Sequence, residues 1–301
     1  MRTSCLLCAV VLTAASRLLA QDYEIRFERA YVEGQEYEIT ASGTDSNEMT
    51  WAAQGKESQT TVSSFAARLE GIVRVLEIDK LNQVKRLRLL VSAFWVSRNG
   101  STNEVEVLPR WTHVMAESRE GQKRFLVGDQ PVSAETAEVL GAFISLSTTQ
   151  TTDDDVFGSK GRKKVGDSWP VNCTNIVAGL SELGAVVVPD RCGGQAKVER
   201  LTVVDGVECL EISVRMDVDR VVTSSLRGLA AKDASVSASV SCSGEFPLDM
   251  SLNRLGEEET MRATAWAKVE PTADAPYDTV SMTTVLTARM RYRPIQPKHD
   301  W

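Results

Sequence analysis

The sequence predicts a mainly β fold, an α+β arrangement rich in strands, in which long antiparallel hairpins carry one to three short helices. Residues 207–218 and 236–246 alternate between apolar and polar side chains, and a period of two sorts such side chains onto opposite faces of a strand. Asp205-Gly206 separates the first of these strands from an extended run at residues 198–204. Asp-Gly is a preferred type I′ turn, so the two runs are predicted to form a hairpin.

Further strands are predicted wherever β-branched and aromatic residues cluster between turn-forming residues. They cover residues 69–79, 84–97, 110–118, 123–127, 248–253, 260–268 and 279–292. Gly121 and Gly256 mark two more hairpin turns.

Helices are predicted to be few. Ser133 is placed to cap a helix over residues 134–146, whose apolar side chains form one stripe that would pack on a sheet. Residues 176–183 and 223–231 show weaker helical patterns.

The chain divides into two loosely repeat-related halves. The predicted organisation is a signal peptide at 1–20, an N-terminal β-rich half at 21–150, a polar linker at 151–164 and a C-terminal β-rich half at 165–297. Residues 32–37 and 165–169 share a valine, a glycine, polar residues and an aromatic that enters an extended segment. Long predicted hairpins follow each of these two segments.

The N-terminus carries the parts of a secretory signal peptide. Arg2 precedes an apolar run at residues 5–12, and small residues follow at 13–16. The run is far shorter than the roughly 20 residues of a membrane-spanning helix, and no other stretch is apolar enough to span a membrane. We therefore expect export to the periplasm or the extracellular space, with cleavage after Ala15, Ser16 or Ala20.

The charge balance argues against nucleic acid as a partner. Removing residues 1–20 takes away Arg2 and Arg17 and leaves 32 basic against 41 acidic side chains, a net charge of −9. Phosphate binding depends on clustered Lys and Arg. The one dense basic run, at residues 160–164, follows three aspartates at 153–155, and the two runs offset each other in a solvated linker.

The segment Val165-Gly166-Asp167-Ser168-Trp169 carries a family resemblance. Together with the acidic, Phe-containing stretch at 153–157, it resembles uncharacterised secreted bacterial β-rich families with a vGdsW segment. The resemblance extends loosely over residues 133–292, and it implies export and a β-rich scaffold but no reaction. Gly166 and Asp167 suit a turn, and Trp169 is a large anchor for the strand that follows.

Four cysteines remain after removal of the leader: Cys173, Cys192, Cys209 and Cys242. An even number in an oxidising compartment favours disulfides, and four cysteines allow three pairings. Bonds Cys173–Cys192 and Cys209–Cys242 are favoured because each closes a local loop. Strict alternation puts Cys209 and Cys242 on opposite faces of their strands, so the second bond requires a β-bulge.

No catalytic constellation is visible. His113 and His299 are the only histidines, and no Gly-x-Ser-x-Gly elbow, P-loop or dinucleotide fingerprint occurs. No CxxC pair suggests zinc, and the calcium-loop pattern that starts at Asp153 fails at Phe157 and Lys164. We therefore predict no catalytic residue, no cofactor and no metal ligand.

Two functions from different classes remain open. The first is a non-catalytic envelope protein that binds an apolar small molecule or a protein partner on a curved sheet, where Trp51, Trp95, Trp111, Trp169 and Trp266 could contribute. The second is an exported hydrolase that acts on envelope polymers through acidic residues. A deep pocket holding two carboxylates with raised pKa values would favour the hydrolase.

Overall fold

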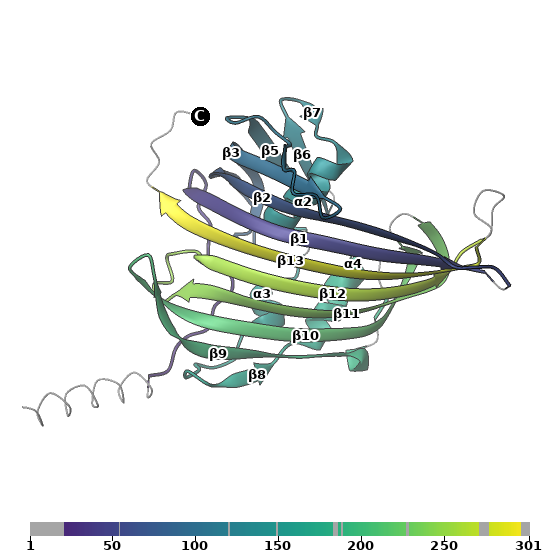
Figure 1. Cartoon of the computed structure of the whole chain (residues 1–301). Coiled ribbons are helices and arrows are strands. Elements are labelled where there is room, and N and C mark those ends of the chain that lie inside the picture. The colour runs from purple at the N-terminus through teal and green to yellow at the C-terminus, as the bar shows by residue number, and fades with distance from the viewer. Residues whose placement is uncertain are drawn as a thin grey trace, which may run out of the picture.

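The computed structural model describes residues 21–53, 55–119, 121–148, 150–182, 186–187, 189–226, 229–270 and 277–295. The predicted signal peptide and His299 lie outside the described residues. Most of the described chain belongs to one large antiparallel sheet, which confirms the predicted β-rich class (Figure 1).

In the described residues the sheet has 13 strands, of which ten are long or of moderate length and three are short. In spatial order they run β7-β6-β5-β3-β2-β1-β13-β12-β11-β10-β9-β8, and β4 pairs with β3. The strands are β1 (Glu36–Ala52), β2 (Gln59–Ile78), β3 (Val84–Arg98), β4 (Val105–Glu106), β5 (His113–Arg119), β6 (Gln122–Val127), β7 (Gln130–Pro131), β8 (Ser168–Pro170), β9 (Cys192–Val204), β10 (Val207–Leu226), β11 (Leu229–Pro247), β12 (Gly256–Lys268) and β13 (Thr279–Ile295).

The first and last long strands lie side by side at the centre of the sheet. β1 pairs with β13 along its whole length, from Glu36 opposite Ile295 to Ala52 opposite Thr279. The N-terminal and C-terminal strands therefore form one continuous sheet. That the two halves are repeats of one unit stays a prediction.

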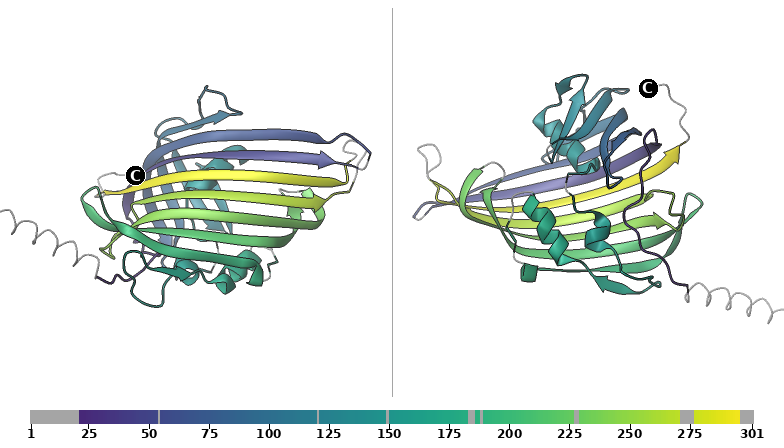
Figure 2. Two further views of the ribbon diagram at one scale, coloured as in Figure 1. Left: turned by 60° about the horizontal axis from the view of Figure 1, so that its bottom comes forward. Right: turned by 180° about the vertical axis from the view of Figure 1, so that it is seen from behind.

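Three α-helices and a 3₁₀ turn lie on one face of the sheet, together with the N-terminal segment (Figure 2). They are α2 (Ala134–Phe143), α3 (Asp153–Phe157), α4 (Cys173–Glu182) and η1 (Pro189–Arg191). The Ser133 side chain accepts a hydrogen bond from the backbone N–H of Thr136, which confirms the predicted cap of α2. α3 lies inside the predicted polar linker, where Thr152 and Asp155 form a capping box.

Two sequence predictions are wrong. Residues 223–226 end β10 and residues 229–231 begin β11, so the predicted helix at 223–231 is instead the end of a long hairpin. Residues 248–253 form turns between β11 and β12 rather than a strand. For the central strand β1, the sequence patterns predicted only an extended segment that begins at the aromatic residue of 32–37.

Three buried clusters of the described residues pack on the face of the sheet that holds the helices. The N-terminal core packs β1, β2, β3, β5 and β6 against α2 through Leu69, Phe94, Leu140 and their neighbours. The C-terminal core packs the N-terminal segment and α4 against β9 to β11 through Phe27, Trp169 and Ile212. A smaller strand-end core contains Ala234, Ala265, Ala267, Val280 and Met282.

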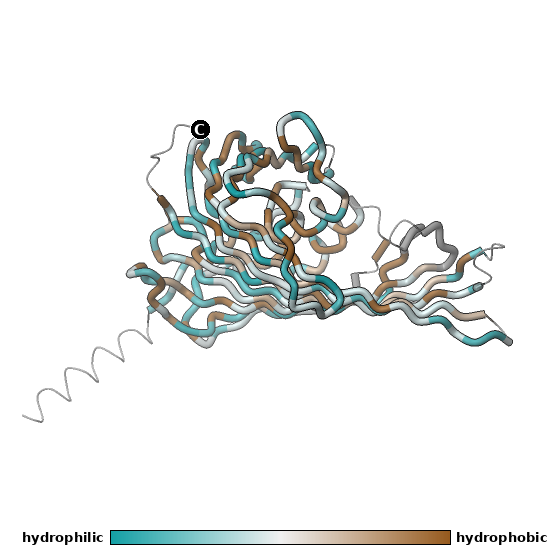
Figure 3. The backbone as a smooth tube through the Cα atoms, turned by 45° about the horizontal axis from the view of Figure 1, so that its top comes forward, coloured by the Kyte–Doolittle hydropathy of each residue, from teal (hydrophilic) through white to brown (hydrophobic). Residues whose placement is uncertain are grey.

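The approach of α2 to the sheet depends on one glycine. A Cβ atom at Gly43 of β1 would lie 3.1 Å from the Phe143 ring and 2.5 Å from the Thr287 carbonyl oxygen. The helix can therefore lie directly on the centre of the sheet. Beyond the helices, the long strands continue as an extension of the sheet that carries the strand-end core (Figure 3).

Candidate ligand-binding site

Side chains alternate between two faces along the long strands. On β13, Val280 and Met282 are buried on the face that holds the helices, whereas Ser281 and Thr283 between them are exposed on the other face. We call these the concave and the convex face. The convex face of the central strands is rich in Ser and Thr, as the polar side of a half-buried sheet should be.

The strand register places one line of large apolar side chains across the concave face. Asp45 of β1 lies between Phe65 of β2 and Leu286 of β13. From Leu286 the line continues through directly paired residues on the next three strands. The five apolar members, here named the concave row, are Phe65, Leu286, Met261, Val240 and Met216.

The middle of the concave row is open. Phe65 packs against the N-terminal core and Met216 against the C-terminal core. Leu286, Met261 and Val240 belong to none of the three cores that the described residues form, and each is only half-buried. Three neighbouring large apolar side chains are thus left partly exposed at the centre of the face, where a ligand could cover them.

A buried polar cluster borders the concave row. The Asn47 amide donates to Asp45 Oδ1 at 2.7 Å, and the Thr284 hydroxyl donates to Asn47 Oδ1 at 2.6 Å. All three residues are more than nine-tenths buried. The cluster separates the concave row from the strand-end core, because Asn47 and Thr284 stand two residue pairs further along β1 and β13.

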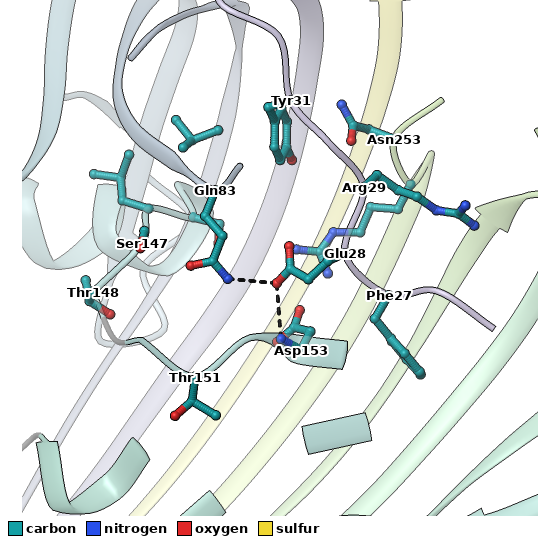
Figure 4. Close-up of a pocket in the computed structure, with 14 residues that line it drawn as sticks. Phe27, Glu28, Arg29, Tyr31, Gln83, Ser147, Thr148, Thr151, Asp153 and Asn253 are labelled. Carbon is teal, nitrogen blue, oxygen red and sulfur yellow. Dashed lines mark hydrogen bonds between the residues drawn. The ribbon is translucent and has the colours of Figure 1, made fainter. Parts of the chain in front are cut away.

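A small polar pocket lies nearer the N-terminal segment, with a volume of about 160 Å³ (Figure 4). Glu28 points into it and accepts hydrogen bonds from Gln83 Nε2 at 3.0 Å and from the backbone N–H of Asp153 at 3.1 Å. Tyr31, Thr151 and Ser147 are also on its wall, among other lining residues. The pocket sits between the N-terminal segment and the connection from α2 to α3.

Charged groups gather in the interior beside this pocket. Burial, with the nearby Asp153 carboxylate, raises the pKa of Glu28. Burial and the neighbouring Glu257 raise the pKa of Glu259 on the concave face of β12. Arg254 lines the pocket and forms an ion pair with Glu257 at 3.0 Å. Glu28 and Asp153 are the two carboxylates among the residues that line the pocket. The Glu28 carboxylate accepts hydrogen bonds from the Gln83 side chain and from the Asp153 N–H.

Lys123 bonds to the end of α2 and lies near Glu259. Its ammonium donates to the carbonyl oxygens of Gly141 and Ile144, each at 2.9 Å, at the C-terminal end of the helix. Burial lowers its pKa, and Glu259 opposes that shift. A cation at this end of a helix also stabilises the helix dipole.

The residues of the vGdsW segment lie at the start of β8. Gly166 adopts a φ of +91°, which favours glycine, and Asp167 Oδ2 accepts a hydrogen bond from the Lys164 N–H at 2.9 Å. Trp169 is 6% exposed in the C-terminal core, and its indole N–H donates to the Phe157 carbonyl at 2.7 Å. These contacts give all three residues a structural role.

The four cysteines are free thiols in the structure. Burial together with the neighbouring Cys173 thiol raises the pKa of Cys192 to about 12. The bond Cys173–Cys192 therefore stays a prediction that the geometry favours.

The predicted pairing of Cys209 with Cys242 is wrong. Cys209 lies opposite Pro247, and Cys242 lies opposite Val214, so the two cysteines are five residue pairs apart along the β10–β11 ladder. At about 3.4 Å per residue, this separation is far beyond the reach of a disulfide. The sequence placed the two cysteines on neighbouring strands but could not reveal the register.

The remaining candidates are scattered. Of the five tryptophans considered for ligand binding, Trp51 is partly buried against the strand-end core. Trp111 and Trp266 are 65% and 40% exposed, and Trp266 lies on the convex face. His113 begins β5 and is exposed. In the described part of the chain, no group of three or more His, Cys, Asp or Glu side chains is arranged to hold a metal ion.

No protein-family model and no curated protein matches the chain. Among solved structures, it is similar to a lipovitellin studied for its lipid–protein interactions, at 10% identity and a TM-score of 0.34. The match covers 91% of this chain and 27% of lipovitellin. The chain is thus similar to only about a quarter of that protein.

Two bacterial structures show weaker similarity. A LolA superfamily protein from Nitrosomonas europaea is 11% identical with a TM-score of 0.17, and the match covers 94% of each chain. An outer membrane channel from Pseudomonas putida F1 is 9% identical with a TM-score of 0.22, over 88% of this chain and 97% of the channel. TM-scores this low do not define a common fold.

None of the described helices combines the length and the apolar character that crossing a membrane would require.

Proposed function

We propose that this chain is an exported, non-catalytic binding protein that holds an apolar ligand, such as an acyl chain, on the concave face of its sheet. One observation carries the proposal. Leu286, Met261 and Val240 stand side by side on three central strands, only partly buried and outside every core of the described residues. Such a patch at the centre of a curved sheet is a typical place for an apolar ligand.

The dimensions of the concave row suit a chain-like ligand. The whole row, from β2 to β10, crosses five strand spacings of about 4.8 Å, or about 24 Å, and its open middle, from β13 to β11, crosses two, or about 10 Å. One leaflet of a bilayer, half of the hydrocarbon thickness, holds an extended acyl chain in about 15 Å. The open middle could therefore cover about two-thirds of an acyl chain that lies across the strands.

Export is supported by the leader-like residues 1–20.

The hydrolase alternative has less support from the polar pocket, because about 160 Å³ is smaller than the 300–1,000 Å³ typical of ligand pockets. In addition, the Gln83 side chain and the Asp153 N–H already donate hydrogen bonds to the Glu28 carboxylate.

A titration with a fluorescent fatty acid tests the proposal. We expect saturable binding to the mature chain with about one site, and a loss of affinity of about tenfold or more when Met261 and Leu286 are both replaced by Gln. The matched control is Thr260→Gln with Thr287→Gln, which alters the adjacent residues on the convex face of the same two strands. Equal affinity in the two double variants, or no binding by the parent chain, would refute the proposal.

A further inference from the structure

The beginning of β2 is paired on one side only. Residues 59–63 pair with β1, from Gln59 opposite Trp51 to Ser63 opposite Asn47. The pairing of β2 with β3 starts only at Phe65, which lies opposite Arg98. No strand of the described residues covers the other side of residues 59–63, and all five are exposed.

Asn99 fixes which backbone groups face this open edge. Its N–H donates to the Ser64 carbonyl at 2.8 Å, and its side-chain oxygen accepts from the Ser64 N–H at 3.2 Å. Ser64 therefore directs both backbone groups toward β3. Because these directions alternate along a strand, Thr60 and Val62 direct their N–H and C=O groups outward at the open edge.

The open edge lacks the usual protection against pairing. Strands at an edge commonly carry charges or proline, which discourage another strand from adding to the sheet. Elsewhere in this sheet, β7 and β8 end at Pro131 and Pro170, and the free part of β9 carries Glu199 and Arg200. Residues 59–63 contain neither proline nor charge, and Val62 is 64% exposed.

We propose that two copies of this chain associate by antiparallel pairing of their β2 edges, with Thr61 on the two-fold axis. Thr60 then lies opposite the partner's Val62, and Val62 lies opposite the partner's Thr60. In each of these two pairs the outward N–H and C=O groups of both residues face each other. Each pair can therefore form two hydrogen bonds, four in total. The result is one sheet continuous through both copies.

A second copy fits this edge better than an arbitrary strand because the segment is complementary to itself. The exposed length is the same on both sides, since residues 59–63 lie opposite the partner's residues 63–59. Asn99 blocks further pairing at one end, and β2 begins at the other. No like charges oppose each other, and β-branched Thr60 and the partner's Val62 form a favourable cross-strand pair. An interface of this size is small, so we expect a concentration-dependent dimer.

The Thr61→Cys variant tests the pairing directly. Opposed residues that do not share hydrogen bonds have Cα atoms about 4.5 Å apart, within the range of a disulfide. With oxidised glutathione as the electron acceptor, we expect this variant to form a covalent dimer on a non-reducing gel, while the parent chain, which keeps its four own cysteines, does not.

A matched variant separates pairing from random collision. Val62→Pro removes an N–H that faces the open edge and makes no bond within the sheet, so the fold should persist while pairing is lost. We expect Thr61→Cys with Val62→Pro to cross-link at most one-tenth as much, and sedimentation of the parent chain, but not of Val62→Pro, to shift with concentration. A monomeric parent chain at high concentration, or cross-linking that Val62→Pro leaves unchanged, would overturn the proposal.

Discussion

Glu259 lies on the concave face of β12 among other charged side chains. Glu257 is two residues away on the same face, and the charges of Arg254 and Lys123 act on it from neighbouring elements. Burial and Glu257 together outweigh the two cations and raise its pKa above the ordinary value of 4.5. The folded protein therefore holds the Glu259 proton more tightly than the unfolded chain does.

This shift predicts a pH-dependent effect of Glu259→Gln. Because the pKa is raised in the folded state, the contribution of Glu259 to the free energy of unfolding is most favourable below about pH 4.5. It declines as the pH rises through the folded-state pKa. The neutral glutamine avoids that decline. We expect the variant to match the parent chain near pH 4 and to be the more stable of the two near pH 8, as measured by urea unfolding. A difference that does not change with pH would contradict this explanation.

Trp169 links the linker segment to the C-terminal core through its indole N–H. Trp169→Phe would leave the Phe157 carbonyl without this donor and would reduce the buried volume. We expect the free energy of unfolding to fall by about 1–3 kcal/mol. Trp266→Phe is the control, because Trp266 is 40% exposed on the convex face and the change there should stay within about 0.5 kcal/mol. Equal effects of the two substitutions would contradict the structural role of Trp169.

At the scale of elements, the cysteine pair connects α4 with β9. Cys173 is the first residue of α4 and Cys192 the first of β9, and the Cys173 thiol is near enough to raise the pKa of Cys192. In an oxidising compartment we expect these two to form a disulfide, while Cys209 and Cys242 stay reduced. Thiol titration of the unreduced, denatured mature chain should find two thiols, and four after reduction.

The same bond should affect stability. A disulfide that closes a loop of about 20 residues contributes roughly 3 kcal/mol. We therefore expect dithiothreitol to lower the melting temperature of the oxidised parent chain by several degrees and to leave Cys173→Ser with Cys192→Ser unchanged. If reduction affects both proteins equally, the bond between α4 and β9 is not the cause.

The elements that sequence patterns predicted well are those with apolar periodicity. Residues 207–218 and 236–246 alternate clearly and lie in β10 and β11. β1 shows no such pattern, because Gly43, Asp45 and Asn47 occupy its concave positions at the centre of the face. The weak helical pattern at 223–231 was too short to distinguish a helix from strand ends.

At the scale of the whole molecule, the site depends on register more than on any motif. The members of the concave row come from five strands, and β2 and β10 are about 150 residues apart in the chain. Each member looks like an ordinary core residue in its own strand. Only the pairing of β1 with β13, which joins the two ends of the chain, brings Phe65 and Leu286 into one line. The general idea of a binding sheet could be predicted, but the residues of its site could not.

The most direct test of the account is to locate a bound acyl chain on the sheet. A spin-labelled fatty acid broadens the NMR signals of nearby methyl groups, and Leu286 and Val285 are adjacent residues of β13 on opposite faces. We expect the methyl signals of Leu286 and Met261 to broaden more strongly on binding than those of Val285. Broadening of Val285 in preference to Leu286, or of neither despite bound ligand, would contradict a ligand site on the concave face.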